Sequence, residues 1–532
     1  MRKSKYAGDP EILHELAKIT AAKGMDKNSG GNGRYIYINL SMVRMQTAWI
    51  YPKLLYAKGV AEKTGAGIIA LYWREDPCLK ELLDSFGIEL ICIDDEIKKH
   101  FGAFLKTCFK TAAFMISDGS GEGLLKLKSG RVPVGASIYE DILRTSSFST
   151  LRSCRNKTCL RKILHLLWMY YSLEKVLRKK KPILMIADDV AYHEWMIEAL
   201  FHEKGALIRR SDEQIEEDIY FEDNLLLKRR AKRLNECVHE LIETTGDEML
   251  EDAEKYIEER FKGKNGIALD RQAFKGKKVM EREDIIKSLH LDPKKKNAVI
   301  LAHTFSDAVF GYGMTYFRDY YDWCDRTLEM ASKIDNVNWI LKPHPSRKSY
   351  NESKDSIEKM FERHRSENMY FMSDEYSAEN LGKIADVIIT IGGNGGAESA
   401  CRGVPAVIVG HPFYKGFGYT IEPADVEEYK KTLENLDKVE RLNEEQIKTA
   451  KKVFYMANCR HTVSWYFKDE FAMMIRKKYE HMFDEMALQY FESDKGTEKY
   501  NDEITRSIIE YAKTHDLREC EYYQRGKNSC TA

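Results

Sequence analysis

Short apolar runs alternate with longer amphipathic stretches along most of the chain, first in one block and then in a second. Strand followed by helix, repeated in this way, is typical of a parallel sheet that helices cover on both faces. The pattern therefore predicts an α/β protein with two such sheets. The predicted strands are 34–40, 67–73, 88–95 and 182–189 in the first block, and 297–303, 336–345, 368–373, 386–392 and 405–410 in the second.

The helical and charged segments between and after these blocks set the predicted domain boundaries. Residues 221–264 read as long charged helices, and the glycine- and lysine-rich stretch that follows has little apolar periodicity. We predict an N-terminal domain over 1–275, a second domain over 290–442, and a helical C-terminal extension over 443–532.

Composition limits the kinds of partner. The chain has 532 residues, 43% hydrophobic and 32% charged, with 84 basic and 84 acidic side chains. This balance creates no overall field that favours nucleic acid, so any anion site must be local. The 11 cysteines are scattered, as in proteins with reduced thiols. We find no apolar core of a signal peptide near the N-terminus and no run of about 20 apolar residues, which predicts a cytoplasmic protein.

A glycine-rich turn joins the predicted strand 386–392 to a helix that opens near Ala397. Glycines let backbone N–H groups approach a ligand, and a helix N-terminus carries partial positive charge, so this turn suits a phosphate. Glu398, in the first helical turn, could accept hydrogen bonds from ribose hydroxyls. Alternatively, Glu398 complements the helix dipole and the glycines only permit a tight turn. The turn consists of Gly392, Gly393, Asn394, Gly395 and Gly396.

A rigid basic corner ends the predicted strand 336–345. Its two prolines restrict the backbone around His344, so that the imidazole is aimed in one direction. With its neighbours, this ring provides donors for a phosphate or a sugar hydroxyl, although a proline-stopped strand with a solvated histidine would look the same. The carboxyl ends of strands in a doubly wound sheet face one crevice, which places this corner near the glycine-rich turn. The residues of the corner are Lys342, Pro343, His344, Pro345 and Ser346.

Two further segments supply candidate acid/base groups at strand ends. His303 follows the strand 297–303, and we predict that it contacts phosphate or transfers a proton, with Asp307 orienting it; capping of the next element is the alternative. In the first domain, Asp188 and Asp189 end a strand shortly before His193 and Glu194. Either aspartate could deprotonate an acceptor hydroxyl, although carboxylates in such places also cap helices.

Residues 151–182 form a basic amphipathic stretch, with ten lysines and arginines against the single acidic residue Glu174. Such a helix could dock peripherally on the inner face of an anionic membrane. We favour the alternative, in which its apolar stripe packs on the sheet and its basic face lies in water. The stripe comprises Leu160, Ile163, Leu164, Leu167 and Trp168.

Several motifs between residues 297 and 420 resemble those of the capsule polysaccharide biosynthesis family, which includes the transferases that add β-linked Kdo to capsule lipid anchors. That family has a His-Pro motif, a small-residue turn that leads to a glutamate in a helix, and a Pro-Phe-Tyr segment with spaced glycines. The matching positions are His344-Pro345, Glu398, Gly403, Pro405, Pro412-Phe413-Tyr414, Gly416, Gly418 and Thr420.

The resemblance implies a GT-B glycosyltransferase, in which two Rossmann-like domains face each other and the C-terminal one holds the donor nucleotide. Related His-Pro motifs occur in bacterial sialyltransferases and teichoic acid glycerophosphotransferases, whose donors carry CMP or CDP. A cytidine-linked donor, with a Kdo- or sialic-acid-like sugar and a glycan or lipid-linked acceptor, is therefore the expectation. One departure is that Gly393-Asn394 stands where the family usually has paired hydroxyl side chains.

Other functions fit the same residues. A polyol-phosphate transferase that uses CDP-glycerol, a non-catalytic protein that binds nucleotide sugar or polysaccharide, and a sugar-nucleotide epimerase share this architecture. We predict no metal and no cofactor other than the nucleotide-sugar co-substrate, because helix dipoles with Lys342 and His344 could stabilise the leaving phosphate.

Overall fold

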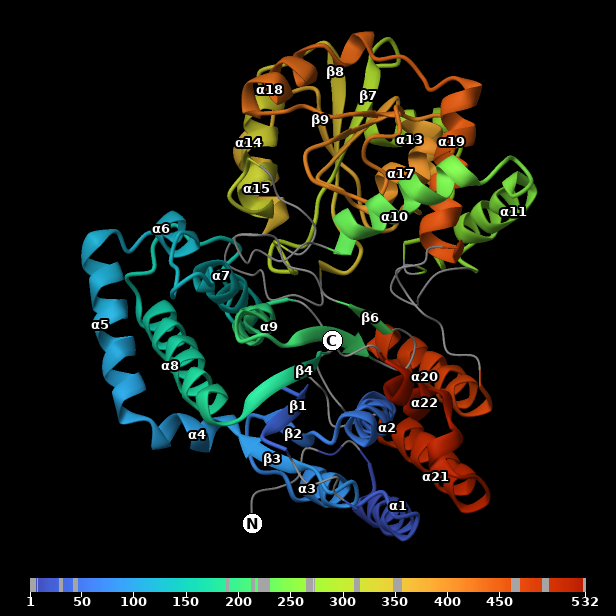
Figure 1. The fold of residues 1–532 in the computed structure, drawn as a ribbon. Coiled ribbons are helices and arrows are strands. Elements are labelled where there is room, and N and C mark those ends of the chain that lie inside the picture. Colours follow the sequence, from blue (N-terminus) through green and yellow to red (C-terminus); the bar gives the residue numbers. More distant parts are fainter. Residues whose placement is uncertain are drawn as a thin grey trace. The chain divides into compact units, whose positions relative to one another are not determined.

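The computed structural model contains two compact units, each described separately (Figure 1). The first comprises Met1–Tyr139, Ser153–Lys228 and Ser464–Ala532, and the second comprises Glu140–Arg152 and Arg229–Val463. The structure describes residues 6, 8–27, 32–41, 46–187, 191–211, 216–218, 230–264, 271, 273–310, 316–347, 356–460, 469–489 and 497–529.

The sheet of the first unit has the strand order β3-β2-β1-β4-β5-β6. All its pairs are parallel except β5–β6, which is antiparallel. The order reverses between β1 and β4, as it does in Rossmann-like sheets. The strands are β1 (Arg34–Asn39), β2 (Gly67–Tyr72), β3 (Glu89–Cys92), β4 (Lys181–Ala187), β5 (Leu207–Ser211) and β6 (Glu216–Asp218).

Helices cover both faces of this sheet (Figure 1). The first three helices and the last three helices of the chain pack on one face in a single apolar core, and α8 and α9 pack on β4. The helices are α1 (Pro10–Ala22), α2 (Thr47–Thr64), α3 (Pro77–Asp84), α4 (Ile93–Lys99), α5 (Phe101–Ser117), α6 (Gly121–Leu125), α7 (Val134–Thr145, which contains a division between the units), α8 (Lys157–Lys179), α9 (His193–Glu203), α20 (Glu470–Gln489), α21 (Glu498–Thr514) and α22 (Glu521–Asn528).

The second sheet repeats this order with strands of its own, as β12-β11-β10-β7-β8-β9, and every pair is parallel. Its order reverses between β7 and β10. The predicted α/β class, with two largely parallel Rossmann-like sheets, is thus confirmed. The strands are β7 (Lys296–Leu301), β8 (Val337–Lys342), β9 (Met369–Phe371), β10 (Val387–Thr390), β11 (Ala406–Ile408) and β12 (Thr420–Ile421).

The helices of the second unit lie on both faces of its sheet (Figure 1). Buried apolar side chains of α11, α13, α16, α17 and α19 form one core with β7, β8, β10 and β11. The helices are α10 (Arg230–Thr244), α11 (Leu250–Phe261), α13 (Arg282–Leu289), α14 (Tyr320–Ala331), α15 (Ile357–His364), α16 (Glu379–Ile384), α17 (Asn394–Ala400), α18 (Val426–Glu434) and α19 (Glu444–Tyr455).

The units divide the chain differently from the predicted domains 1–275, 290–442 and 443–532. Helices α10 and α11, predicted for the first domain, belong to the second unit, where Asn235 Nδ2 donates to the carbonyl oxygens of Phe413 (2.9 Å) and Lys415 (2.7 Å). The predicted C-terminal extension is not a separate part, because residues from Ser464 onward complete the first unit. Amphipathic periodicity shows that a helix buries one face but not which sheet it covers.

Helix α22 joins the first unit through an unusually close contact with α2. A Cβ atom at Gly59 would lie 2.1 Å from the Tyr523 carbonyl oxygen, and one at Gly526 would lie 2.1 Å from that of Tyr56. Only glycine permits the two backbones to approach so closely. Helix α21 adds a polar contact, since the Thr47 N–H donates to Asn501 Oδ1 (2.8 Å) across 454 positions of sequence.

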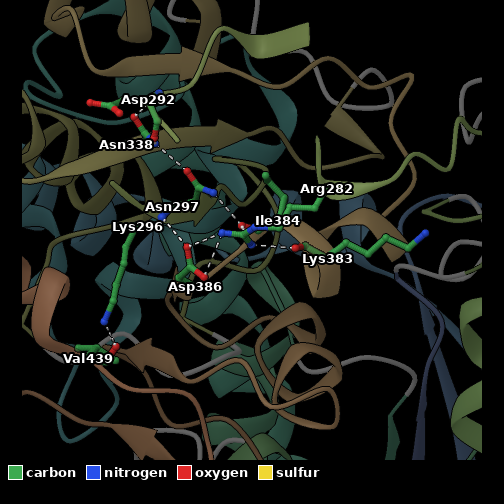
Figure 2. Close-up of polar contacts among 9 residues, drawn as sticks. All are labelled: Arg282, Asp292, Lys296, Asn297, Asn338, Lys383, Ile384, Asp386 and Val439. Atoms are coloured by element: carbon green, nitrogen blue, oxygen red, sulfur yellow. Dashed lines mark hydrogen bonds and ion pairs between the residues drawn. The ribbon is translucent and has the colours of Figure 1, made fainter. Parts of the chain in front are cut away.

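A polar network holds α13 and α16 against the amino ends of β7, β8 and β10 (Figure 2). Asp386 accepts from the Asn297 N–H (2.9 Å) and from Arg282 Nη2 (3.1 Å), while Asn338 Nδ2 donates to Asn297 Oδ1 (2.8 Å). Asn297 and Asn338 are buried, so these bonds satisfy groups that would otherwise destabilise the core. This edge of the sheet is therefore structural, and the candidate site lies at the opposite edge.

Candidate functional site

Three adjacent strands of the second sheet end in register at its carboxyl edge. Leu301 of β7 pairs with Lys342 of β8, and Ile300 of β7 pairs with Ile389 of β10. His303, His344 and Gly392 therefore each stand two residues beyond the same row, on the strands β7, β8 and β10. The order of the sheet reverses between β7 and β10, which is where ligands bind in open α/β sheets.

His303 lies at the centre of this row and contacts both neighbours. Its ring centroid is 6.4 Å from that of His344, with nearly parallel planes 20° apart. A Cβ atom at Gly393 would lie 3.4 Å from His303 Cε1. Tyr320, at the start of α14, packs on the ring at a centroid distance of 4.8 Å. The structure thus brings the two histidines and the glycine-rich turn together, as the sequence predicted.

The surroundings of His303 keep its imidazole neutral. Burial, with a smaller effect from His344, lowers the pKa of His303 to about 3. The Thr390 hydroxyl accepts from the Gly393 N–H (3.3 Å) and lies 3.5 Å from His303 Nε2. A hydroxyl that accepts from the amide can donate its own hydrogen to Nε2, and the ring then carries its proton on Nδ1.

His344 is half-buried at the end of β8. The backbone N–H of Ser346 donates to His344 Nδ1 (3.2 Å), which makes that nitrogen an acceptor. The neutral ring therefore carries its proton on Nε2, which is a hydrogen-bond donor. This geometry explains the two prolines that flank His344. They restrict the backbone so that the Ser346 N–H reaches Nδ1 and fixes the tautomer of the ring.

Lys342 is buried, and its Nζ donates to the Tyr376 carbonyl oxygen (3.0 Å). Burial, together with the nearby cations Lys277 and Arg347, lowers the pKa of Lys342 to about 8, while Asp374 opposes the shift. The ammonium group therefore remains mostly charged at pH 7 and contributes positive potential near the strand end. Its hydrogen bond is directed at the loop after β9.

The glycine-rich turn is braced from behind by Tyr414. The Tyr414 hydroxyl donates to the Gly393 carbonyl oxygen (2.8 Å), and a Cβ atom at Gly396 would lie 2.5 Å from that hydroxyl oxygen. A Cβ atom at Gly395 would lie 2.6 Å from Leu301 Cδ1. These two glycines thus permit close packing, whereas Asn394, the first residue of α17, is exposed. Tyr414 thus supports the turn, and its predicted contact with the nucleotide sugar stays a prediction.

Glu398 makes an ion pair that the sequence did not suggest. Its Oε1 accepts from Nε of Arg260 (2.8 Å), and both side chains are buried, with 9% and 3% of their surface exposed. Arg260 ends α11, so the pair ties α11 to α17. The role of Glu398 toward a ribose stays a prediction, because one of its oxygens already serves this contact.

The remaining predicted residues lie around this row. Pro345 is partly exposed, and Ser346 is buried beside His344. Asp307 is partly exposed in the loop that follows β7, and its predicted effect on His303 stays a prediction. Asp188 and Asp189 lie outside the described residues.

The first unit has a second polar cluster, at the equivalent edge of its own sheet. Glu194, fully buried at the start of α9, accepts hydrogen bonds from Nδ2 of Asn39, the last residue of β1, and from Oγ of Ser41, two residues later. His193 Nε2 lies 3.3 Å from Glu194 Oε1, and its ring packs on Trp73 at 5.2 Å. Sequence analysis placed His193 and Glu194 at this strand end but missed Asn39 and Ser41, although they end the neighbouring strand.

The apolar stripe of residues 151–182 mostly packs inside the first unit. Ile163 and Leu167 of α8 are buried, Leu164 and Trp168 are partly buried, and Leu160 is 41% exposed. Helix α8 packs on β4 and α9, which agrees with the packing role that we favoured for this stripe.

Neither metal ligands nor membrane spans stand out in the part of the chain that the structure describes. Its His, Cys, Asp and Glu side chains form no group of three or more that could hold a metal ion. None of its helices combines the length and the apolar character needed to cross a bilayer. The cysteines among these residues are free thiols.

Comparison with known proteins identifies the second unit. Residues 253–458 match the sequence profile of a family described as capsule polysaccharide biosynthesis protein. The matched segment contains β7 to β12, both histidines and the glycine-rich turn, and it extends back to α11 with Arg260. The resemblance inferred from residues 297–420 is thus confirmed. No curated protein matches the chain significantly.

Several solved structures are similar to parts of this chain. A β-Kdo 2,7-transferase, KpsC of Thermosulfurimonas dismutans, is 15% identical over 57% of this chain and 84% of its own, with a TM-score of 0.33. A glycosyltransferase from Rickettsia africae is 11% identical over 86% and 99%, with a TM-score of 0.27. UDP-GlcNAc 2-epimerase from Neisseria meningitidis is 11% identical over 80% and 97%, with a TM-score of 0.23. Because these identities and TM-scores are low, the functional argument rests on the family match and on the geometry of the site.

Proposed function

We propose that the chain is a GT-B-type glycosyltransferase of surface polysaccharide synthesis, because residues 253–458 match the profile of the capsule polysaccharide biosynthesis family. It transfers a sugar, Kdo- or sialic-acid-like, from a cytidine-nucleotide donor to a glycan or lipid-linked acceptor. The observation that carries this proposal is the convergence of His303, His344 and the glycine-rich turn at one edge of the second sheet.

The proposed donor phosphate binds between the turn and His344. Gly393, the N-cap of α17, has no side chain to accept from the first helical N–H groups, so these groups can donate to an anion. The Nε2–H of His344 donates to the same phosphate, and neutral His303 donates from Nδ1. Fixed donors of this kind stabilise charge that develops on the leaving nucleotide, and they need no metal ion.

We expect CMP and CDP to raise the melting temperature of the protein more than UDP does. A ligand at about 100 times its Kd stabilises the native state by about 2.7 kcal/mol, or a few degrees for a unit of this size. Differential scanning fluorimetry measures this directly. Stabilisation by UDP without stabilisation by the cytidine nucleotides would contradict the donor assignment.

A matched pair of variants locates the bound nucleotide. Asn394→Asp places a carboxylate at the N-terminus of α17, which suits the helix dipole but repels a phosphate. Asn443→Asp makes the same change at the N-cap of α19, elsewhere in the same unit. The first variant should lose the cytidine-dependent shift, and the second should keep it.

The products distinguish a sugar transferase from a polyol-phosphate transferase. A sugar transferase should release CMP from CMP-sugars but not from CDP-glycerol.

We further propose that the first unit binds the acceptor and that His193 deprotonates its hydroxyl group. Glu194 then acts as a positioning residue, because it is held by Asn39 and Ser41 and lies 3.3 Å from His193 Nε2. A neutral imidazole that a carboxylate orients is a common general base. The cluster stands at the point where the first sheet reverses its order.

His193→Asn and Glu194→Gln are each expected to lower kcat for transfer by about 10²–10⁴-fold, the range for a general base. The double variant should be no slower than the slower single variant, because residues that act as a unit are not additive. Steady-state kinetics and the CMP-induced thermal shift are the measurements. Losses that multiply in the double variant, or a weakened CMP shift, would indicate a structural role instead.

A further inference from the structure

Helix α5 presents a row of large apolar side chains to solvent. Phe101 is 68% exposed, Leu105 43%, Phe109 77% and Ile116 82%. Their spacing of four, four and seven residues places them on one face of the helix. Among the described residues, the structure has only three other exposed large apolar side chains, and one of these, Leu160, lies on the adjacent α8.

The buried face of α5 explains why the helix forms without this row. Ala103, Thr107 and Phe114 are buried, and Phe104 packs on Trp168 of α8 at a centroid distance of 4.8 Å. Helix α5 packs on α8, which separates it from the sheet, so α5 is an outer layer of the first unit (Figure 1). The core of the first unit therefore does not need the exposed side chains of α5. Contiguous apolar surface of this kind marks a contact with another partner.

Charge beside the row indicates what that partner is. Helix α5 contains no acidic residue, and its Lys106 and Lys110 flank the apolar row. The first 17 residues of α8, 157–173, also lack acidic residues and carry Lys157, Arg161 and Lys162. Lys157 and Arg161 are exposed near Leu160, the apolar residue that α8 adds. The two helical segments that carry this face thus contain cations and no acidic residue, although Lys106 pairs with Glu174 farther along α8 (3.6 Å). Such a face complements an anionic lipid surface, in which acyl chains lie beneath negative headgroups.

We propose that α5 and the first half of α8 dock the protein on the surface of an anionic bilayer. Phe101, Leu105, Phe109 and Ile116 enter the boundary between headgroups and acyl chains, and the flanking cations contact lipid phosphates. This surface is remote in sequence from the candidate donor site, and the inference does not depend on the proposed function. It assigns lipid contact mainly to α5, whereas sequence analysis considered such a contact only for residues 151–182 and favoured packing there.

Co-sedimentation of the full chain with vesicles tests the proposal without nucleotide or acceptor. The protein should bind phosphatidylcholine vesicles that contain phosphatidylglycerol and should bind vesicles of phosphatidylcholine alone at least tenfold more weakly. Raising the salt concentration should weaken binding, because exposed charges are screened. Equal binding to both vesicles, or no binding to either, would overturn the proposal.

Matched variants locate the contact. Phe109→Glu with Ile116→Glu should reduce vesicle binding at least tenfold, and Lys110→Glu with Arg161→Glu should do so with little effect on folding. Val279→Glu and Met473→Glu, which change exposed apolar residues elsewhere (49% and 46% exposed), should bind as the wild type does. Circular dichroism checks that each variant is folded.

Light scattering in the absence of lipid tests the alternative, in which another protein molecule binds the apolar row. If the wild type is an oligomer that Phe109→Glu with Ile116→Glu dissociates, the apolar row is a protein–protein interface and the lipid proposal is wrong. If the oligomeric state is the same in both, and only the variant loses vesicle binding, the row contacts lipid.

Discussion

The His344→Ala variant is expected to transfer sugar about 10²–10³-fold more slowly than the wild type, as when one fixed donor to a developing anion is removed. The Ser346 N–H holds Nδ1, so it is the Nε2–H that the variant loses. Because His344 is only half-buried, the free energy of unfolding should change by no more than about 1 kcal/mol. Product formation with a CMP-sugar, and urea unfolding, measure the two effects.

Two further variants make this test specific. His344→Gln places an amide N–H close to the position of Nε2, so it should recover part of the lost rate if His344 acts as a donor, and none if it transfers a proton. His364→Ala removes a histidine from α15, in the same unit, where the ring contacts Asp325 (2.7 Å). That control should retain turnover. Near-wild-type transfer by His344→Ala would remove His344 from the mechanism.

The second large effect is expected on stability. Breaking the Arg260–Glu398 pair with Glu398→Gln or Arg260→Met leaves a buried group without its partner, which costs about 3–5 kcal/mol. Replacing both residues by apolar ones, Arg260→Met with Glu398→Leu, should recover most of this loss, because a buried pair is worth little more than good packing. Urea unfolding of the wild type, the two single variants and the double variant measures the loss and its recovery.

The same series tests the predicted contact between Glu398 and a ribose. If the pair is only an anchor between α11 and α17, the Met/Leu double variant should still show the CMP-dependent thermal shift. If Glu398 also binds ribose, the double variant should lose that shift although it recovers its stability. A stable Glu398→Gln variant would contradict the predicted cost of breaking the pair.

Local patterns in the sequence were enough to predict the other strands of both sheets and most of the candidate site, but they missed β5, β6 and β12. Apolar runs marked the strands, and residues that follow strands of a parallel sheet must gather at its carboxyl edge. That rule brought His303, His344 and the glycine-rich turn together without any knowledge of strand order. The Thr390 hydroxyl was missed because it lies inside the apolar run, where a threonine looks like an ordinary β-branched strand residue.

Contacts between distant segments could not be predicted in the same way. Arg260 sits in a charged helix whose periodicity shows a buried face but does not identify Glu398 as its partner. Gly59 lies inside a helix, where glycine is unfavourable, and only the contact with α22 explains why it is there. The exposed row on α5 was missed for the opposite reason, since an apolar stripe in the sequence is normally assumed to be buried.

The close contact between α2 and α22 also affects how the chain acquires its structure. Helix α2 is buried on nearly every side, and part of its cover comes from a segment that is synthesised more than 450 positions later. The second unit has all its strands before that segment emerges from the ribosome, so its core can close first. In the first unit, the apolar surface of α2 stays partly uncovered, and open to aggregation, until the C-terminal helices have been synthesised. Contacts of such long range also form slowly.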